Sequence, residues 1–499
     1  MSTRITPAES SDVSRHMAPG PGSSRWLVPL LPAVIGFGVS LWGVASPSLW
    51  RDEAATMVVA RMPLRHLFAT LSSVDAVHTL YYLLIHFVID VFGGSATAVR
   101  FPSVLGVAAA AAGTALLGRR LAGARTGLVA GLLVAASPTM SMYAEEARSY
   151  ALVTAVAVWA TYLLVRAIQE PGKNAYAGYG AMIALLGLLH LFAFLVLPAH
   201  AAVAWKAGSR RAWLITIAAA AVAISPFAIF ATTQNSQLDW LVAPGPRDLL
   251  ALVSSFAGSA LLIIPIAALV AVALVKGPED QPSNIDLRLL TTVWIIVPPA
   301  VLLIISLIHP YYIFRYVLLC VPAVALLAAT GLTRLTARLG ARALIPAGVV
   351  LLALSIPAHL AVRAETSRMD DLRRAATILE DNQRPGDVLV LHRGTYRHIT
   401  AAYPAAYAHL KDLSRSQTPT KSDTLDGVEV TMAHFQARLN ALPAGQRLWF
   451  QDNYVVPGRR GHNSPLTNLK ARLIQHGSAF RLEGRWTFHG GTLYLYIKA

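Results

Sequence analysis

The residues of this chain best suited to chemistry begin with Arg51-Asp52-Glu53, which follows a long apolar run at residues 26–45. A membrane span takes about 20 apolar residues, so two carboxylates and a guanidinium group follow at the membrane surface. Charges there are costly unless they face water, a partner or a cavity, and they therefore predict a functional site. The alternative is a solvated helix start, with Asp52 as the N-cap and Glu53 in the first turn.

Other ionisable side chains stand near the ends of later apolar runs. A carboxylate can accept a proton from a hydroxyl group, and a guanidinium group forks onto phosphate oxygens. A set that mixes the two fits general-base chemistry on a substrate that carries phosphate. The set comprises Asp52, Glu53, Arg100, Glu145, Glu146, Arg148, His190, His309 and Arg315, with the aromatic residues Tyr82 and Tyr316.

The composition indicates which kind of protein must position these groups. Of 499 residues, 55% are hydrophobic and only 14% are charged, and the mean hydropathy is +0.52. These values indicate an integral membrane protein. The net charge of +16 does not predict nucleic-acid binding, because most Lys and Arg residues before the C-terminal region lie in short loops between apolar runs. The single cysteine, Cys320, excludes a disulfide framework and a cysteine metal site.

The apolar runs predict a polytopic α-helical membrane protein with about eleven transmembrane helices. Segment 79–93 is short for a span and carries a polar or aromatic residue at every fourth position from His78 to Asp90, so we expect a helix in the membrane interface. Pro63 divides residues 53–70 into two more short interfacial helices. The predicted spans lie near residues 26–45, 98–118, 124–142, 150–168, 176–190, 191–206, 212–231, 249–275, 289–308, 313–332 and 343–360.

The charges of the loops predict the orientation of the chain. With the N-terminus inside, the N-terminal segment and the inner loops carry sixteen Lys and Arg residues, and the outer loops before the C-terminal region carry seven. Counting 79–93 as a span would reverse this bias, against the tendency of short cytoplasmic loops to be basic. The orientation brings most ionisable residues at helix ends to the outer face, where acidic and basic groups converge.

Residues 362–499 are predicted to form an extracytoplasmic α/β domain. Residues 363–499 hold 19 Lys and Arg and 12 Asp and Glu residues, with no run of membrane length. Helices are expected at 370–380 and 465–475, strands at 387–392 and 447–450, and a hairpin at 481–497. The expected domains are a disordered cytoplasmic N-terminus at 1–25, a transmembrane domain at 26–361 with its first outer loop at 46–97, and the α/β domain at 362–499.

Several cofactor-dependent chemistries have no motif in this sequence. There is no GxxxxGK[ST] loop, no HExxH and no Cys and His cluster with zinc spacing. An Asp-x-Asp pair, which often holds a metal ion on the diphosphate of a nucleotide sugar, is missing too. The sequence therefore favours a donor that is not a nucleotide, requires no cofactor, and leaves the use of a divalent metal open.

Five short stretches follow one another in a characteristic order between residues 26 and 335. They are Trp50-Arg51-Asp52-Glu53-Ala54; Thr79-Leu80-Tyr81-Tyr82 with Phe92-Gly93; Val99-Arg100-Phe101-Pro102-Ser103; Ser137-Pro138 with Tyr143-Ala144-Glu145-Glu146-Ala147-Arg148-Ser149-Tyr150; and Phe314-Arg315-Tyr316 with Pro322. In this order the chain resembles the membrane-embedded GT-C glycosyltransferases, above all the bacterial branch related to protein O-mannosyltransferases and the lipid A aminoarabinose transferase. The resemblance implies inverting transfer of a sugar from a polyprenyl-phosphate-linked donor at the outer membrane face, with Asp52 as the catalytic carboxylate.

The resemblance leaves the sugar and the acceptor open. Mannose is the family default, and arabinofuranose or another pentose is the alternative. The loop at 232–247 is short where eukaryotic-type O-mannosyltransferases insert a large luminal domain, so a lipid-linked or cell-wall glycan is expected as the acceptor. The expected location is the bacterial inner (plasma) membrane, with the bilayer, the donor and the acceptor as partners and no nucleic acid. A lipid-linked sugar flippase or a non-catalytic receptor are the competing functions, but the interiors of the runs are nearly free of charge.

The expected roles divide the candidate residues into a base, a phosphate clamp and substrate contacts. Asp52 is expected to accept the proton of the attacking hydroxyl, while Glu53 supports the local structure or the acceptor. The residues expected to contact substrate are Glu145, Glu146, Tyr82, His190, His309 and Tyr316, although the histidines and tyrosines also fit interfacial packing.

Arg100, Arg148 and Arg315 are expected to hold the developing charge of the donor phosphate. Two of them have a structural alternative. Arg100 can act as a helix-end anchor at the membrane surface, and Arg148 can pair with Glu145 one turn back.

Overall fold

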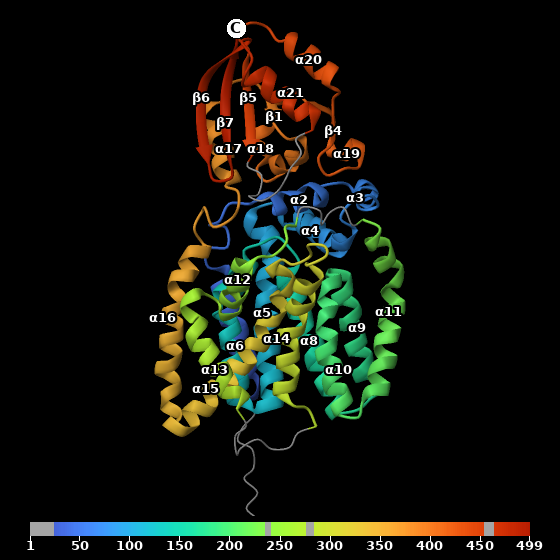
Figure 1. The fold of residues 1–499 in the computed structure, drawn as a ribbon, viewed down its shortest axis with the longest axis vertical. Helices are drawn as coiled ribbons and strands as arrows, with labels where there is room; N and C mark the ends of the chain where they lie inside the picture. Colours follow the sequence, from blue (N-terminus) through green and yellow to red (C-terminus); the bar gives the residue numbers. More distant parts are fainter. Residues whose placement is uncertain (1–23, 235–240, 276–283, 454–463) are drawn as a thin grey trace, which may run out of the picture.

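The computed structural model describes residues 24–234, 241–275, 284–453 and 464–499. A helical bundle and an α/β region lie end to end along the long axis of the molecule (Figure 1). The predicted fold class, a polytopic helical membrane protein with a C-terminal α/β region, is confirmed. The predicted disordered N-terminus at 1–25 lies almost entirely outside the described residues, as does part of the 232–247 loop.

Each predicted apolar run is helical. The bundle comprises α1 Ser24–Leu41, α5 Ala96–Ala122, α6 Ala124–Ala135, α7 Pro138–Ala144, α8 Tyr150–Gln169, α9 Lys173–Leu189, η2 Leu191–Val196, α10 Leu197–Lys206, α11 Arg210–Thr232, α12 Pro246–Ala257, η4 Ala260–Leu262, α13 Ile263–Leu274, α14 Leu287–Ile305, η5 Phe314–Cys320, α15 Val321–Leu339, η6 Ala341–Ala343 and α16 Leu344–Val362, where η marks a 3-10 segment. Among the described residues, six helices are long and apolar enough to cross a membrane, or up to eight if each of two bent pairs is one span. The chain is therefore a multi-pass membrane protein, and the other predicted spans are shorter helices.

One of the bent pairs brings the chain to the predicted site. Helices α6 and α7 meet at an angle of 55°. Pro138 opens α7, and a proline disfavours helical backbone at the residue before it, so α6 ends there. Helix α7 then ends at the turn that contains Glu145 and Arg148. The next helix, α8, packs tightly on α5, because a Cβ atom on Gly106 would lie only 2.9 Å from the backbone of Ala151.

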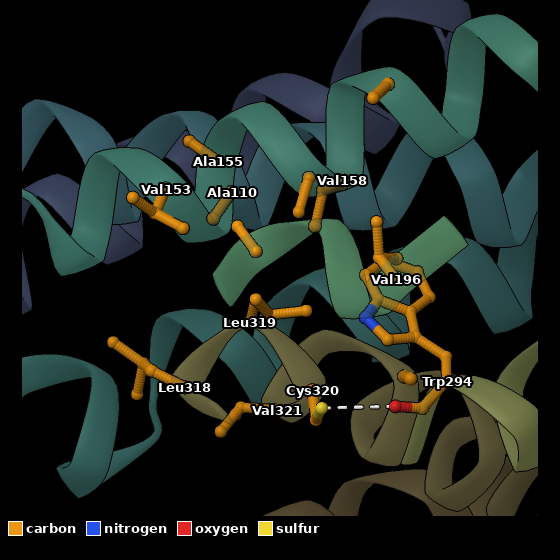
Figure 2. Packing of buried hydrophobic residues seen from close by; sticks show 14 of the residues in the cluster. Ala110, Val153, Ala155, Val158, Val196, Trp294, Leu318, Leu319, Cys320 and Val321 are labelled. Carbon is orange, nitrogen blue, oxygen red and sulfur yellow. Dashed lines mark hydrogen bonds between the residues drawn. The ribbon is translucent and has the colours of Figure 1, made fainter. Parts of the chain in front are cut away.

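The segment with Arg315 is fixed by dense apolar packing. Leu318, Leu319 and Cys320 of η5 are buried among residues of α8, η2 and α14 (Figure 2). The thiol of Cys320 donates to the carbonyl oxygen of Trp294 at 3.1 Å. A close-packed core of this kind resists displacement. The backbone that carries Arg315, at the start of η5, is therefore held rigidly.

Residues 46–97, predicted as the first outer loop, form short helices across one end of the bundle, beside the α/β region (Figure 1). They are α2 Arg51–Ala60, α3 Leu64–Leu71, η1 Ala76–His78 and α4 Thr79–Phe92. Pro63 precedes α3 and separates it from α2, as predicted. The location of these helices in the membrane interface stays a prediction.

The C-terminal α/β region is built around a five-stranded sheet in the order β2-β1-β5-β7-β6. Strand β1 runs parallel to β2 and β5, while β7 runs antiparallel to β5 and β6. Both predicted helices, both predicted strands and the predicted hairpin are present. The elements are α17 Leu372–Asn382, β1 Val388–Leu391, η7 Gly394–Ala401, α18 Pro404–Tyr407, β2 Lys411–Asp412, β3 Arg415–Gln417, α19 Pro419–Ser422, β4 Val428–Glu429, α20 Met432–Asn440, β5 Arg447–Asn453, α21 Pro465–Ile474, β6 Phe480–Phe488 and β7 Gly491–Lys498.

The predicted orientation has a direct test. Gly123 ends the 27-residue helix α5, whose other end adjoins α4, and a helix of that length spans about 40 Å. We expect a reporter fused at Gly123 to read as cytoplasmic and one fused at Gly490 as extracytoplasmic, because the loop charges place them on opposite sides. Alkaline phosphatase and fluorescent-protein fusions measure both. An extracytoplasmic signal at Gly123 would contradict the orientation.

Candidate functional site

An ion pair between Asp52 and Arg315 forms the centre of the candidate site. Asp52 lies in the first turn of α2, and its Oδ2 atom is 2.6 Å from a terminal nitrogen of Arg315. The guanidinium group of Arg315 lies over the ring of Tyr150 at 5.5 Å and near that of Tyr316 at 6.0 Å. The side chain of Asp52 keeps 23% of its surface exposed. Two predicted site residues from distant parts of the chain therefore meet, and the carboxylate stays accessible.

Arg148 lies beside this pair as a buried cation. One terminal nitrogen donates to Thr56 Oγ1 at 3.5 Å, and the other lies 3.1 Å from His78 Nε2. Within the described part of the chain no carboxylate lies within ion-pair distance of Arg148, and the alternative pair with Glu145 does not form. The charges of Asp52 and Asp75 act on this buried guanidinium group from beyond ion-pair distance, so the position favours an anionic ligand in direct contact with it.

The charges around Asp52 control its ionisation. Burial by itself raises the pKa of the Asp52 carboxyl, but the positive charges of Arg315 and Arg148 outweigh burial and hold the pKa below its ordinary value. A carboxylic acid with a lowered pKa is fully ionised at neutral pH. Asp52 is thus held as a carboxylate, the form that a general base requires.

Aromatic rings line the side of the site formed by the bundle. The ring of His190 lies 4.8 Å from that of Tyr316 and 5.8 Å from that of Tyr150, between centroids. Phe192 packs on Tyr316 at 5.2 Å. Tyr82 joins from α4, donating its hydroxyl to Asp75 and packing on His78 at 6.0 Å. Three predicted substrate contacts, Tyr82, His190 and Tyr316, therefore lie together around the charged centre.

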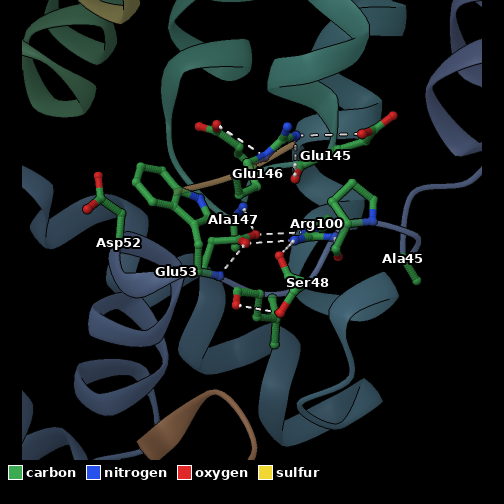
Figure 3. A network of polar contacts seen from close by, with 12 residues as sticks. Ala45, Ser48, Asp52, Glu53, Arg100, Glu145, Glu146 and Ala147 are labelled. Atoms are coloured by element: carbon green, nitrogen blue, oxygen red, sulfur yellow. Dashed lines mark hydrogen bonds and ion pairs between the residues drawn. The ribbon is translucent and has the colours of Figure 1, made fainter. Parts of the chain in front are cut away.

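Glu53 and Arg100 form a separate, fully buried pair. Arg100 Nε and Nη2 lie 2.8 Å and 2.7 Å from the two oxygens of Glu53, and both side chains have 0% exposure. The other three N–H groups of Arg100 donate to the carbonyl oxygens of Val44, Pro47 and Ser48. Figure 3 shows Arg100 between Glu53 and Ser48. All five donors of a guanidinium group are therefore in use.

This pair corrects the expected roles of both residues. Arg100 has no donor left for a phosphate, and it is neither a clamp nor a surface anchor. Glu53 accepts from the backbone N–H of Ala147 at 2.7 Å as well, so it ties the start of α2 to the turn that precedes Arg148. Glu53 was expected to support either the local structure or the acceptor, and these contacts fit the first role. Its complete burial argues against a catalytic role.

We expect Arg100→Ala to destabilise the fold by about 3–5 kcal/mol, because it leaves the Glu53 carboxylate buried without its partner. Thermal unfolding in detergent measures the effect, with exposed Arg65→Ala as the control. A variant that unfolds like the wild type but uses donor poorly would restore Arg100 to the phosphate clamp.

Glu145 and Glu146 face arginines that the sequence did not associate with them. A carboxylate oxygen of Glu145 lies 3.6 Å from Arg363 and the other 3.6 Å from Arg368, while Glu146 lies 3.7 Å from Arg368. Burial raises the pKa of each carboxyl to about 7, although Arg368 opposes it. Figure 3 shows Asp52 and Glu146 with their carboxylates on the same side of the Glu53–Arg100 pair. The charges of Arg315 and Asp52 act on Glu146, which links this carboxyl group to the charged centre.

His309 also lies apart from the charged centre. It is exposed, and its ring packs on Tyr311 at 4.8 Å. Its position after α14 explains the difference, because α14 ends before the chain turns inward to η5. His309 is therefore left out of the site proposed below.

Three neighbours of the charged centre were not predicted as site residues. Asp75 and His78 precede α4, and Tyr150 follows Arg148 by two residues. The fourfold spacing from His78 to Tyr82 was a usable signal, since it places both on one helical face. Asp75 carried no signal, because it reaches the site through a left-handed backbone conformation, with φ of 62°. In the described part of the chain, no group of three or more His, Cys, Asp or Glu side chains is arranged to hold a metal ion.

Comparison with known proteins gives matches in sequence and in structure. A family model described as dolichyl-phosphate-mannose-protein mannosyltransferase matches residues 78–233. No curated protein sequence matches. The crystal structure of ArnT from Cupriavidus metallidurans in the apo state superposes with a TM-score of 0.61 at 12% identity, over 95% of this chain and 98% of that chain.

Two further solved structures are similar. The structure of ArnT from Cupriavidus metallidurans bound to undecaprenyl phosphate has a TM-score of 0.57 at 12% identity, with the same coverage of both chains. The Archaeoglobus fulgidus oligosaccharyltransferase in complex with Zn and sulfate has a TM-score of 0.49 at 14% identity, over 85% of this chain and 68% of that chain. The chain has the fold of the GT-C membrane glycosyltransferases, as the resemblance of its sequence predicts.

Proposed function

We propose that the chain is an inverting glycosyltransferase that moves a sugar from a polyprenyl-phosphate-linked donor to a hydroxyl group of a cell-envelope acceptor. The observation that carries the proposal is the arrangement of Asp52, Arg315 and Arg148. An ionised carboxylate lies 2.6 Å from one guanidinium group and beside a second, buried guanidinium group that has no carboxylate partner in the described chain. A base and a phosphate clamp are the two parts that such a transfer needs.

The chemistry follows from these three groups. Asp52 takes the proton of the acceptor hydroxyl as its oxygen bonds to the anomeric carbon of the sugar. The bond between that carbon and the phosphate oxygen breaks, and the electron pair leaves with the lipid phosphate. Arg315 and Arg148 stabilise the added negative charge, because guanidinium groups bind phosphate oxygens in pairs. A single displacement of this kind inverts the anomeric centre.

The aromatic residues fit the sugar end of the donor. Tyr150, Tyr316 and Phe192 lie between the charged centre and the apolar bundle. Aromatic rings bury apolar surface, and the two tyrosines also offer a hydroxyl group. Both properties suit a sugar that is attached to a lipid. The proposed sugar is mannose, because the matched family is described by dolichyl-phosphate mannose as its donor.

The proposed location is the bacterial inner (plasma) membrane, with the N-terminus in the cytoplasm and residues 362–499 outside. This orientation rests on the basic inner loops. It puts Asp52 at the outer face, where a lipid-linked sugar and a lipid-linked or cell-wall glycan can both reach it. The use of a divalent metal stays open.

A donor panel tests this function. Purified protein is incubated with polyprenyl-phosphate mannose, with the arabinofuranose analogue, or with polyprenyl phosphate alone, and with an envelope glycolipid extract as acceptor. We expect glycolipids heavier by one hexose with the first donor only, detected by mass spectrometry. Addition of a pentose with the second donor would show that the transferred sugar is arabinofuranose and not mannose. Movement of intact donor across vesicles without cleavage would contradict the transferase and favour a flippase.

A further inference from the structure

The segment that joins α16 to the α/β region is bonded into the outer loops of the bundle. Arg363 donates to Val39 O at 2.6 Å and to Ser141 Oγ at 2.8 Å. Asp370 accepts two hydrogen bonds from the guanidinium group of Arg51, at 2.5 Å and 2.6 Å. Arg373 donates to Ala45 O at 2.6 Å. These contacts end on α1, on the loop before α2, on the first residue of α2 and on helix α7, and α2 carries Asp52 of the proposed site.

Within this segment, Arg368 lies against the turn that contains Glu145 and Glu146. Its side chain is 2% exposed, and it donates to Met142 O at 3.0 Å. Its guanidinium group bridges the carboxylates of Glu145 and Glu146, at 3.6 Å and 3.7 Å. Among the described residues, both oxygens of Glu145 and one of Glu146 have no hydrogen-bond donor. The positive charge of Arg368 therefore offsets much of the cost of burying the two adjacent carboxylates.

The turn that Arg368 holds leads directly to the proposed phosphate clamp. After Glu146, the N–H group of Ala147 donates to Glu53, and its carbonyl oxygen accepts from Thr56 at 3.2 Å. The next residue is Arg148, whose carbonyl oxygen accepts from Ser103 Oγ at 3.2 Å. A displacement of the turn at Glu146 would therefore also displace Arg148, which follows two residues later.

The groups that face the two carboxyls set the consequence of losing Arg368. Glu145 is faced by Arg368, Arg363 and Arg100, and by its neighbour Glu146. Glu146 is faced by Arg368 and Arg315, and by the carboxyls of Glu53 and Asp52. Without Arg368, Glu146 would keep Arg315 against the two carboxyl groups of Glu53 and Asp52. A buried carboxylate without compensation takes up a proton or moves.

We propose that Arg368 is a positioning residue of the donor site, which makes the docked C-terminal region a condition for full activity. It touches neither the donor nor the acceptor. It fixes the turn at Glu145 and Glu146 and thereby the place of Arg148. The part of this proposal that concerns donor use rests on the proposed function; the part that concerns the turn does not.

Hydrogen–deuterium exchange tests the turn without any substrate. We expect Arg368→Gln to raise exchange in peptides that cover residues 142–150, and Arg368→Lys to raise it less, because lysine keeps the charge. Arg374→Gln is the control, since Arg374 is an exposed arginine of the neighbouring helix α17. Unchanged exchange in residues 142–150 of Arg368→Gln would overturn the proposal, whatever the protein transfers.

Donor kinetics and a double variant test the consequence. We expect Arg368→Gln to lower kcat/KM for the donor by ~10–10²-fold, since small displacements of a binding group have effects of this size. Adding Glu146→Gln removes the uncompensated carboxyl, so the double variant should lose less than the product of the two single losses. If Arg368→Gln alone folds poorly, the kinetics of the double variant are compared with those of Glu146→Gln instead. Wild-type kinetics in Arg368→Gln, or losses that simply multiply, would overturn the role assigned to Arg368.

Discussion

Asp52→Asn is expected to lower turnover at least ~10²-fold, while membrane insertion and donor binding remain. Asparagine keeps the shape of the side chain and removes its basicity, so the acceptor hydroxyl loses its base. The positive charges of Arg315 and Arg148 hold the pKa of Asp52 below its ordinary value, so the wild-type carboxylate that the variant lacks is ionised throughout the neutral range. Steady-state rates at saturating donor and acceptor measure the loss.

The control for this variant is Asp90→Asn, which alters an exposed carboxylate on α4 outside the charged centre. Asp90→Asn should turn over like the wild type. If Asp52→Asn turned over near the wild-type rate, Asp52 would not be the base. Glu146 would then become the next candidate, because its carboxyl faces the same side as that of Asp52 (Figure 3).

Arg148→Ala is expected to lower kcat/KM for the donor by about 10²–10³-fold, the effect of removing one preorganised charge-stabilising donor. The physical reason is that Arg148 is a buried cation without a carboxylate partner among the described residues, so a bound phosphate would supply its counter-ion. Arg148→Lys should recover part of the loss, because lysine keeps the charge but not the fork. Donor titrations of the initial rate measure both.

Arg247→Ala is the matched control for Arg148→Ala, since Arg247 is an exposed arginine near the start of α12. It should leave donor kinetics unchanged. Arg315→Ala should reduce donor use as well and also free Asp52 from its ion pair. Wild-type donor kinetics in a well-folded Arg148→Ala protein would show that the phosphate binds elsewhere.

The charged centre was predictable because its members stand at the ends of apolar runs on one side of the bundle. Asp52, Arg148 and Arg315 need only the order of the spans and the side of each loop to be brought to the same end. The same reasoning placed Arg100 in the clamp, and there it failed. A sequence shows the charge of Arg100 but not that Glu53 and three carbonyl oxygens occupy all of its donors.

The role of the C-terminal region was not predictable for a different reason. Its helices and strands follow from local patterns, and they form where they were expected. Arg368 reaches Glu145 and Glu146 only because the region docks on the loops at this end of the bundle, a contact between residues more than 200 positions apart. Run length likewise counted eleven spans, because it does not register that the runs at 26–45, 176–190 and 191–206 form shorter helices and that two others are bent by 55° and 73°.

The most direct test of the account is the release of polyprenyl phosphate from a polyprenyl-phosphate sugar by the purified protein. We expect release that requires an acceptor, a product with inverted anomeric configuration by NMR, and almost no release by Asp52→Asn. Equal release by the wild type and Asp52→Asn, or no release with any donor and acceptor, would contradict it.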